Sequence, residues 1–320
     1  MNNLAVFSGN AHPQLAKDIC RELGISLGKA QVFEFTNENI FVKIDENVRG
    51  CDVFVVQPLT SPVNRSIMEL LIILDAFKRA SAQRVTAVVP YYAYGRTDKK
   101  DQPRVPITAR LIADCLSVAG AGRMLTMDLH AGQIQGFFNI PVDELTAKNL
   151  MANYIRGRHI PNLTVVATDA GFAKKARNLA ELLDAPLAIV EKRRTGNDGR
   201  SEAMSLIGSV EGRNALIVDD EIDTAGSLTQ AAQVVRAHGA DEVYACASHG
   251  VLSGPAIERL GAADFCEIIL TDSVPLRPEK RLPNITTLSV APLFAGAIER
   301  IHEERSVSEL FDGHHENSQK

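Results

Sequence analysis

The segment with the clearest chemical signature combines a cluster of carboxylates with a short run of small and hydroxyl-bearing residues. The cluster comprises Asp219, Asp220, Glu221 and Asp223, and the run spans residues 223–227. Such a run can hold a phosphate through backbone N–H groups, hydroxyls and the positive end of a helix dipole. Carboxylates beside it suit paired sugar hydroxyls, because they would repel a second phosphate. The segment therefore predicts a site for a phosphorylated sugar.

A purely local explanation for this segment is an acidic helix cap. Asp and Thr often begin helices because their side chains accept hydrogen bonds from the first backbone N–H groups. That accounts for Asp223 and Thr224. It does not account for the carboxylates before them, because unpaired acids crowded at a buried strand end repel one another and cost stability. We therefore favour the functional interpretation.

Three further segments place polar side chains directly after strand-like runs. Asp128 and His130 form the first, where His130 is either a structural hydrogen-bonding residue or a site residue that contacts a phosphate or, weakly, Mg²⁺. Residues 90–100 combine tyrosines with basic side chains, which can stack a base and bind phosphates, although taken alone a solvated loop is the slightly favoured explanation. Residues 191–200 contain three consecutive cations before a glycine-rich stretch, which can form a mobile loop that closes over polyphosphate, although a surface charge run is the usual explanation. Their shared position after strands favours a common site.

These segments depend on elements that alternate along the whole chain. Strand-like apolar runs are expected at residues 4–7, 53–57, 84–89, 124–127, 164–167, 187–190, 215–218, 243–247, 267–270 and 285–288. Helices are expected between them, at residues 12–23, 66–80, 108–119, 170–183, 227–238 and 254–259. This alternation predicts an α/β fold of βαβ units, with mostly parallel sheets flanked by helices. A break near residues 140–143 predicts two similar halves, residues 1–143 and 144–320.

Composition limits the class of protein. The length of 320 residues suggests about two domains, and the net charge of −5 without a long basic run argues against a nucleic-acid partner. No apolar run approaches the ~20 residues of a membrane span, and no signal peptide is visible. The five cysteines form no Cys-x-x-Cys pair, which fits reduced thiols. We therefore expect a cytoplasmic protein with neither membrane nor nucleic acid as a partner.

Several segments together resemble the ribose-phosphate diphosphokinase (phosphoribosyl diphosphate synthase) family. The most specific of them are residues 48–50, 81–87, 126–131, 133–138 and 218–227, and the resemblance runs nearly end to end. It implies two phosphoribosyltransferase-like domains, 1–143 and 144–320, the second carrying the ribose 5-phosphate loop. It also implies a homo-oligomer, often a hexamer, and Mg²⁺-dependent transfer of the diphosphoryl group of ATP to O1 of ribose 5-phosphate. The products would be AMP and phosphoribosyl diphosphate for nucleotide biosynthesis.

The resemblance also implies roles for individual residues. The ribose hydroxyls would be held by Asp219 and Asp220, and the 5-phosphate by Asp223, Thr224, Ala225, Gly226 and Ser227. The catalytic cations would be Lys192 and Arg194, on a flexible loop. ATP would contact Arg96 and His130, with Phe35 and Asn37 reaching adenine from a neighbouring subunit; His130 and Asp169 would hold Mg²⁺. Phosphate and ADP would act as effectors at an anion site of Arg49, Ser81, Gln135, Ser306 and Ser308.

Two other functions remain open. A non-catalytic homologue could regulate an active synthase, but the residues expected for catalysis and metal binding are all present. A phosphoribosyltransferase that modifies a base would share residues 219–227 without needing His130 or Arg96. The chain departs from the family pattern at Asn39, Thr97, Gly132 and Phe172.

Overall fold

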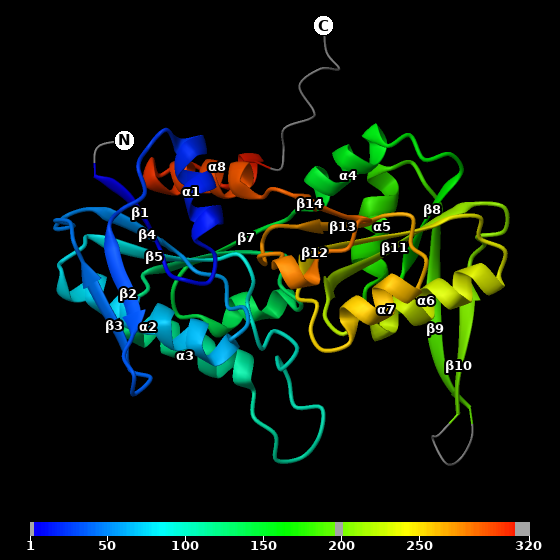
Figure 1. Cartoon of the computed structure of the whole chain (residues 1–320), viewed down its shortest axis with the longest axis horizontal. Helices are drawn as coiled ribbons and strands as arrows, with labels where there is room; N and C mark the ends of the chain where they lie inside the picture. The colour runs from blue at the N-terminus through cyan, green and yellow to red at the C-terminus, as the bar shows by residue number, and fades with distance from the viewer. Residues whose placement is uncertain (1–2, 196–200, 311–320) are drawn as a thin grey trace, which may run out of the picture. The chain divides into compact units, whose positions relative to one another are not determined.

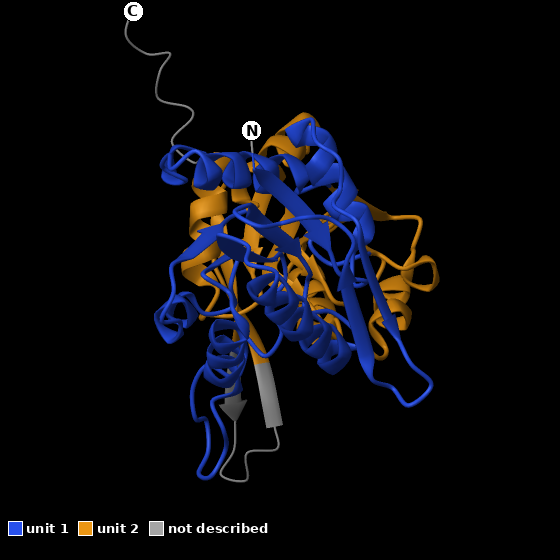
Figure 2. Ribbon diagram, turned by 90° about the vertical axis from the view of Figure 1, so that its left-hand side faces the viewer, with its two compact units in different colours: residues 1–146, 273–275, 289–320 blue, residues 147–272, 276–288 orange. Residues whose placement is uncertain are grey.

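The computed structural model describes residues 3–195 and 201–310, including their side chains except at 192–195 and 201–203. This part of the chain forms two compact units, coloured separately in Figure 2. Unit 1 contains residues 1–146, 273–275 and 289–320, and unit 2 contains residues 147–272 and 276–288. The sequence predicts two similar domains that meet between residues 143 and 144, and this boundary stays a prediction. The compact units do not follow a single cut, because the chain returns to unit 1 after residue 288.

Unit 1 is built on a parallel five-stranded sheet. Its order is β1 (Leu4–Ser8), β4 (Asp52–Val56), β5 (Arg84–Val89), β6 (Arg123–Met127) and β7 (Val142–Leu145). The helices are α1 (Pro13–Leu23), α2 (Val63–Arg79), α3 (Thr108–Ala119) and α8 (Ala291–His302), with a short 3₁₀ helix η1 (Gly132–Phe137). Figure 1 shows α1 and α8 on one side of this sheet and α2 and α3 on the other. Every residue of β4 is buried, as expected for a parallel strand covered on both faces.

Unit 2 is built on a seven-stranded sheet. Its order is β10 (Ser201–Ile207), β9 (Leu187–Thr195), β8 (Leu163–Ala167), β11 (Asn214–Ile222), β12 (Val243–Gly250), β13 (Ile268–Thr271) and β14 (Ile285–Leu288). All neighbours are parallel except β10 and β9. The helices are α4 (Lys148–Gly157), α5 (Ala173–Leu182), α6 (Gly226–Ala237) and α7 (Ala256–Ala262), with short 3₁₀ turns η2 (Pro278–Lys280) in unit 2 and η3 (Ser308–Leu310) in unit 1. The predicted α/β class with mostly parallel sheets is confirmed.

Two strands extend further than the apolar runs predict. Strand β11 continues past Val218 to Ile222, because β12 keeps pairing with it. Strand β9 continues past Val190 to Thr195, because β10 folds back along it. The expectation of a loop from residue 191 is therefore wrong as far as Thr195, and the cations there lie on one arm of a β-hairpin.

A second antiparallel hairpin, not expected from the sequence, projects from unit 1. It consists of β2 (Ala30–Glu34) and β3 (Ile40–Ile44). Strand β2 alternates partly buried and exposed residues, whereas β3 has a short apolar run at residues 40–42, and neither strand has a fully buried residue. None of the helices in the described part of the chain is long and apolar enough to cross a bilayer.

Candidate active site

The carboxylate pair lies where strand β11 outlasts its neighbour. Strand β8 pairs with β11 only as far as Ala167↔Val218, whereas β12 pairs with it as far as Gly250. Residues 219–222 are therefore held by a strand on one side, and β8 has ended on the other. Asp219 and Asp220 thus stand at the carboxyl edge of the sheet, where parallel α/β sheets bind ligands.

Asp219 is fixed by two neighbours. Its Oδ1 accepts the backbone N–H of Asp220 at 2.9 Å, and its Oδ2 accepts the hydroxyl of Thr168 at 2.8 Å. Burial, followed by the charge of the adjacent Asp220 carboxylate, raises the pKa of Asp219 to about 7. The Thr168 hydrogen bond opposes that rise. The two adjacent carboxylates therefore present acceptors to a ligand that carries hydroxyl groups.

The loop predicted to bind a phosphate, residues 223–227, follows β11 directly and leads into helix α6. Ala225 precedes the helix with a positive φ of 60°. The backbone N–H groups of residues 224–227 donate to no acceptor within the described residues. The first N–H groups of a helix lack intrahelical partners and carry the positive end of its dipole. Together with the exposed Thr224 and Ser227, they form a cradle for one phosphate.

Two residues that the sequence did not single out support this loop. Ser253 donates its hydroxyl to the Asp223 carboxylate, and its N–H donates to the Asp223 carbonyl at 2.9 Å. Arg259, on α7, donates Nη1 to the carbonyl of Thr224 at 3.0 Å. A Cβ on Gly226 would lie 3.2 Å from the same Nη1, so a glycine lets this guanidinium approach. Both partners are 30 or more positions away in sequence, beyond the reach of any local pattern.

The loop after β8 places Asp169 at the same edge of unit 2. Asp169 is exposed, and its Oδ1 accepts the N–H of Phe172 at 2.9 Å. Phe172, one of the departures from the family pattern, has an ordinary helical φ of −86°, so its backbone does not require a glycine. Its half-buried ring lies under Lys175 Nζ, 5.8 Å from the ring centroid. The aromatic side chain therefore packs along the start of α5.

In unit 1, the segments carrying Arg96 and His130 meet. A Cβ on Gly95 would lie 3.4 Å from the Cβ of His130, so the two backbones pack closely. Gln133 donates to the carboxylate of Asp98, which joins the same two segments again. Arg96 and His130 are both exposed at this junction. The structure thus brings together two of the predicted ATP-binding residues.

The other two predicted ATP-binding residues lie at the tip of the β2–β3 hairpin. Phe35 is 49% exposed and Asn37 is exposed. The Phe35 ring packs edge-on against Phe33, with centroids 5.2 Å apart, and both contact Phe41. Such an exposed aromatic cluster is suited to stacking against a flat ligand or another chain.

The predicted catalytic cations lie on β9. Lys192 pairs in register with Met204, and Arg194 with Glu202, across the hairpin. Their side chains lie outside the described residues.

The five predicted effector residues are all exposed, and contacts join some of them. Gly50 donates its N–H to the carbonyl of Ser81 at 3.1 Å, so Arg49 and Ser81 belong to neighbouring turns. The hydroxyls of Ser306 and Ser308 lie 2.7 Å apart. Gln135 instead donates to the carboxylate of Glu144. Apart from the serine pair, no hydrogen bond joins the side chains of the five residues within the described part of the chain.

The donor set suits Mg²⁺ only as part of a ligand-bound complex. Within the described residues, no three His, Cys, Asp or Glu side chains converge on one point. Magnesium needs no protein cage, since it is usually held by one or two carboxylates together with substrate phosphates and waters. The exposed carboxylate of Asp169 fits that requirement, and the imidazole of His130 fits it less well because magnesium prefers oxygen.

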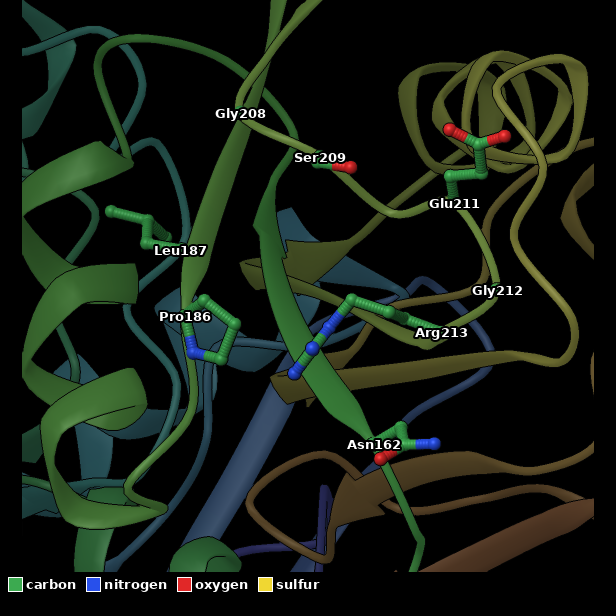
Figure 3. A pocket seen from close by; sticks show the side chains of 8 residues that line it. All are labelled: Asn162, Pro186, Leu187, Gly208, Ser209, Glu211, Gly212 and Arg213. Carbon is green, nitrogen blue, oxygen red and sulfur yellow. The ribbon is translucent and has the colours of Figure 1, made fainter.

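A cavity of about 640 Å³ lies elsewhere in unit 2 (Figure 3). It is lined by residues at the amino-terminal ends of β8, β9 and β11, among them Asn162, Leu187 and Arg213. The Arg213 guanidinium donates to Thr164 Oγ1 at 2.6 Å and to the Leu163 carbonyl at 3.0 Å. The cavity is therefore at the opposite end of these strands from the carboxylates.

Comparisons with known proteins identify the family of this chain. The model of the N-terminal domain of ribose phosphate pyrophosphokinase matches residues 4–120, and that of the phosphoribosyl synthetase-associated domain matches residues 196–312. A ribose-phosphate pyrophosphokinase of Caldanaerobacter subterraneus subsp. tengcongensis is 52% identical over 97% of this chain and 98% of its own length. One from Bacillus subtilis is 47% identical over 97% of each chain. The crystal structure of phosphoribosylpyrophosphate synthetase from Mycobacterium smegmatis superposes with a TM-score of 0.90 at 42% identity, covering 95% of this chain and all of the other. The chain belongs to the ribose-phosphate pyrophosphokinase family.

Proposed function

We propose how this chain carries out ribose-phosphate pyrophosphokinase activity, the transfer of the diphosphoryl group of MgATP to O1 of ribose 5-phosphate. The products are phosphoribosyl diphosphate and AMP, for nucleotide biosynthesis. The observation that carries the proposal is the direct succession of a carboxylate pair, half-buried Asp219 and buried Asp220, and a cradle of N–H groups without acceptors in the described residues, at one sheet edge in unit 2. Carboxylates accept sugar hydroxyls and the cradle accepts a phosphate, so the two together fit a sugar phosphate.

In this proposal, Asp219 and Asp220 accept hydrogen bonds from the ribose hydroxyls, and residues 223–227 bind the 5-phosphate. Holding both ends of the sugar fixes the direction of the O1 hydroxyl that attacks the β-phosphorus. Phosphoryl-type transfer needs little covalent help from the protein, so positioning supplies much of the rate. The supports at Ser253 and Arg259 are consistent with a loop that must be rigid before the substrate arrives.

Cations are proposed to bind ATP and to neutralise charge during transfer. Arg96 contacts the ATP phosphates with His130 beside it, as their packing through Gly95 supports. Lys192 and Arg194 neutralise charge that develops around the β-phosphorus, a role consistent with their position on a projecting hairpin. Bound Mg²⁺ would supply further charge neutralisation on the phosphates, with Asp169 and His130 as its protein ligands.

We further propose that the protein acts in the cytoplasm as a homo-oligomer, a hexamer, in which Phe35 and Asn37 of one subunit contact the adenine bound to another. The exposed ring cluster at the hairpin tip supports this role. Phosphate and ADP would act at the anion site of Arg49, Ser81, Gln135, Ser306 and Ser308. A Phe35→Ala variant should raise the KM for ATP and leave that for ribose 5-phosphate unchanged.

The decisive experiment incubates the purified protein with MgATP and ribose 5-phosphate and quantifies AMP and phosphoribosyl diphosphate together, with and without added phosphate. Equal amounts of both products are expected. ADP in place of AMP would contradict diphosphoryl transfer, and binding of both ligands without turnover would favour a regulatory homologue. Asp220→Asn should weaken ribose 5-phosphate binding, while Asp241→Asn, at an exposed carboxylate of unit 2, should not.

A further inference from the structure

We propose that Thr168 is a positioning residue for ribose 5-phosphate binding, because its hydroxyl orients the carboxylate of Asp219. The inference deepens the proposed function and rests on the assignment of Asp219 to the ribose hydroxyls. Thr168 directly follows β8 and is 2% exposed. Its Oγ1 donates to Asp219 Oδ2 at 2.8 Å, across 51 positions of sequence.

Among the described residues, this is the hydrogen bond that joins the Asp219 carboxylate to a segment other than β11. The remaining contacts of that carboxylate, to the Asp220 N–H and to the Asp220 side chain, come from the next residue on β11. The backbone ladder between β8 and β11 has ended one position earlier, at Ala167↔Val218. A carboxylate that is hydrogen-bonded only to its own strand can still rotate about its side-chain bonds. The hydrogen bond from Thr168 restricts this rotation. The second lone pair of Oδ2 then points in a fixed direction.

The hydroxyl also acts on the charge of the pair. Burial and the adjacent Asp220 carboxylate both favour a protonated Asp219, and the Thr168 hydroxyl favours the ionised acceptor. An ionised carboxylate accepts hydrogen bonds from ribose hydroxyls more strongly than a protonated one. Thr168 therefore improves both the direction and the acceptor strength of the group that meets the sugar.

Position 168 allows the hydroxyl to be removed cleanly. Valine has nearly the shape of threonine without the donor, whereas serine keeps the donor and loses only a methyl group. Thr164 provides a matched control on the same strand, because it is fully buried and hydrogen-bonded, but at the opposite end of β8 from the carboxylates.

The test titrates ribose 5-phosphate into wild type, Thr168→Val, Thr168→Ser, Thr168→Ala, Thr164→Val and Asp220→Asn by calorimetry, without nucleotide. Thr168→Val and Thr168→Ala should each weaken binding by about tenfold, the loss of one hydrogen bond to a charged group. Thr168→Ser should remain within about twofold of wild type on the same grounds. In the complete reaction, Thr168→Val should raise the KM for ribose 5-phosphate by a larger factor than it lowers kcat, and melting temperatures identify any variant that is misfolded.

Three results would overturn the proposal: unchanged affinity in Thr168→Val and Thr168→Ala, an equal loss in Thr168→Ser, or an equal loss in Thr164→Val. An equal loss of affinity in Thr168→Ser would mean that packing of the side chain, not its hydroxyl, causes the effect. An equal loss of affinity in Thr164→Val would mean that any such change in β8 weakens binding. If Asp220→Asn binds ribose 5-phosphate weakly and Thr168→Val binds it normally, only the role of Thr168 is rejected and the proposed function stands. No binding of ribose 5-phosphate by the wild type would reject the proposed function as well.

Discussion

The imidazole Nδ1 of His302 lies 3.0 Å from Oδ2 of Asp52, across 250 positions of the chain and within unit 1. The same carboxylate is held by both Nε and Nη2 of Arg84, and Nη2 also donates to the carbonyl of Ile301 at 3.0 Å. Asp52 is 8% exposed. These contacts fasten the end of α8 to the starts of β4 and β5.

Removal of Arg84 should therefore destabilise unit 1. Arg84→Ala leaves a buried carboxylate short of its main partner and frees a carbonyl, at a cost of about 2 kcal/mol. Urea unfolding followed by circular dichroism measures the change. Arg79→Ala is the matched control, because Arg79 pairs with Asp75 on the surface of α2, where ion pairs contribute little. Equal stability of the two variants would contradict a structural role for the Asp52 cluster.

Lys192→Ala should slow turnover by a factor on the order of 10³ while leaving the dissociation constant of ribose 5-phosphate unchanged, because a cation that acts on developing charge contributes to the transition state. Steady-state kinetics and calorimetry on the same preparation separate the two effects. Lys174→Ala, at an exposed lysine of α5, should retain normal kinetics. A Lys192→Ala enzyme with most of its activity would exclude this side chain from catalysis.

The raised pKa of Asp219 should make the free energy of unfolding decrease as the pH rises. Its pKa is raised from 3.8 to about 7, so between these values the folded state keeps a proton that the unfolded state releases. Stability then falls with increasing pH through that window and stays at its lower level above it. Asp219→Asn should consequently melt at a higher temperature than wild type at pH 8, with a smaller difference at pH 4.5. The same variant should bind ribose 5-phosphate less tightly, and a lower melting temperature at pH 8 would refute the argument.

Two buried threonines on adjacent strands of unit 1 should respond oppositely to valine. Thr86 on β5 is fully buried, and its hydroxyl has no partner within the described residues. Thr126 on β6 is equally buried and donates to the Val89 carbonyl at 2.7 Å. Thr86→Val should be neutral or stabilising, whereas Thr126→Val should cost about 1 kcal/mol. Comparable losses in both unfolding curves would mean that the Thr86 hydroxyl has an unrecognised partner.

The sequence predicted the parts of this protein whose signal is local. The run at residues 215–218 is apolar and β-branched, and it forms the centre of β11. Helix α3 begins and ends where its amphipathic pattern predicts, at Thr108 and Ala119. The succession of acidic residues and small, hydroxyl-bearing residues is equally local, and together with four other segments it led to the correct family.

Features that depend on distant partners could not be predicted in this way. The full length of β11 and β9 is set by pairing with β12 and β10, which no window of sequence contains. Thr168 and Arg259 are unremarkable in sequence, because their importance lies in contacts with Asp219 and Thr224. The β2–β3 hairpin was not predicted, because Phe33 and Phe35 are exposed where apolar residues of a strand are usually buried.

The return of the chain to unit 1 has a consequence for biosynthesis. Phe294 and Ile298 of α8 are completely buried, and α8 packs against α1 near the other end of the sequence. The ribosome synthesises residues 147–288 before this helix. A nascent chain can therefore complete unit 2 while the surface of unit 1 that α8 will cover, including part of α1, is still exposed. We expect chaperones that recognise exposed apolar surface to bind the nascent protein during this interval, and to release it once α8 has left the exit tunnel.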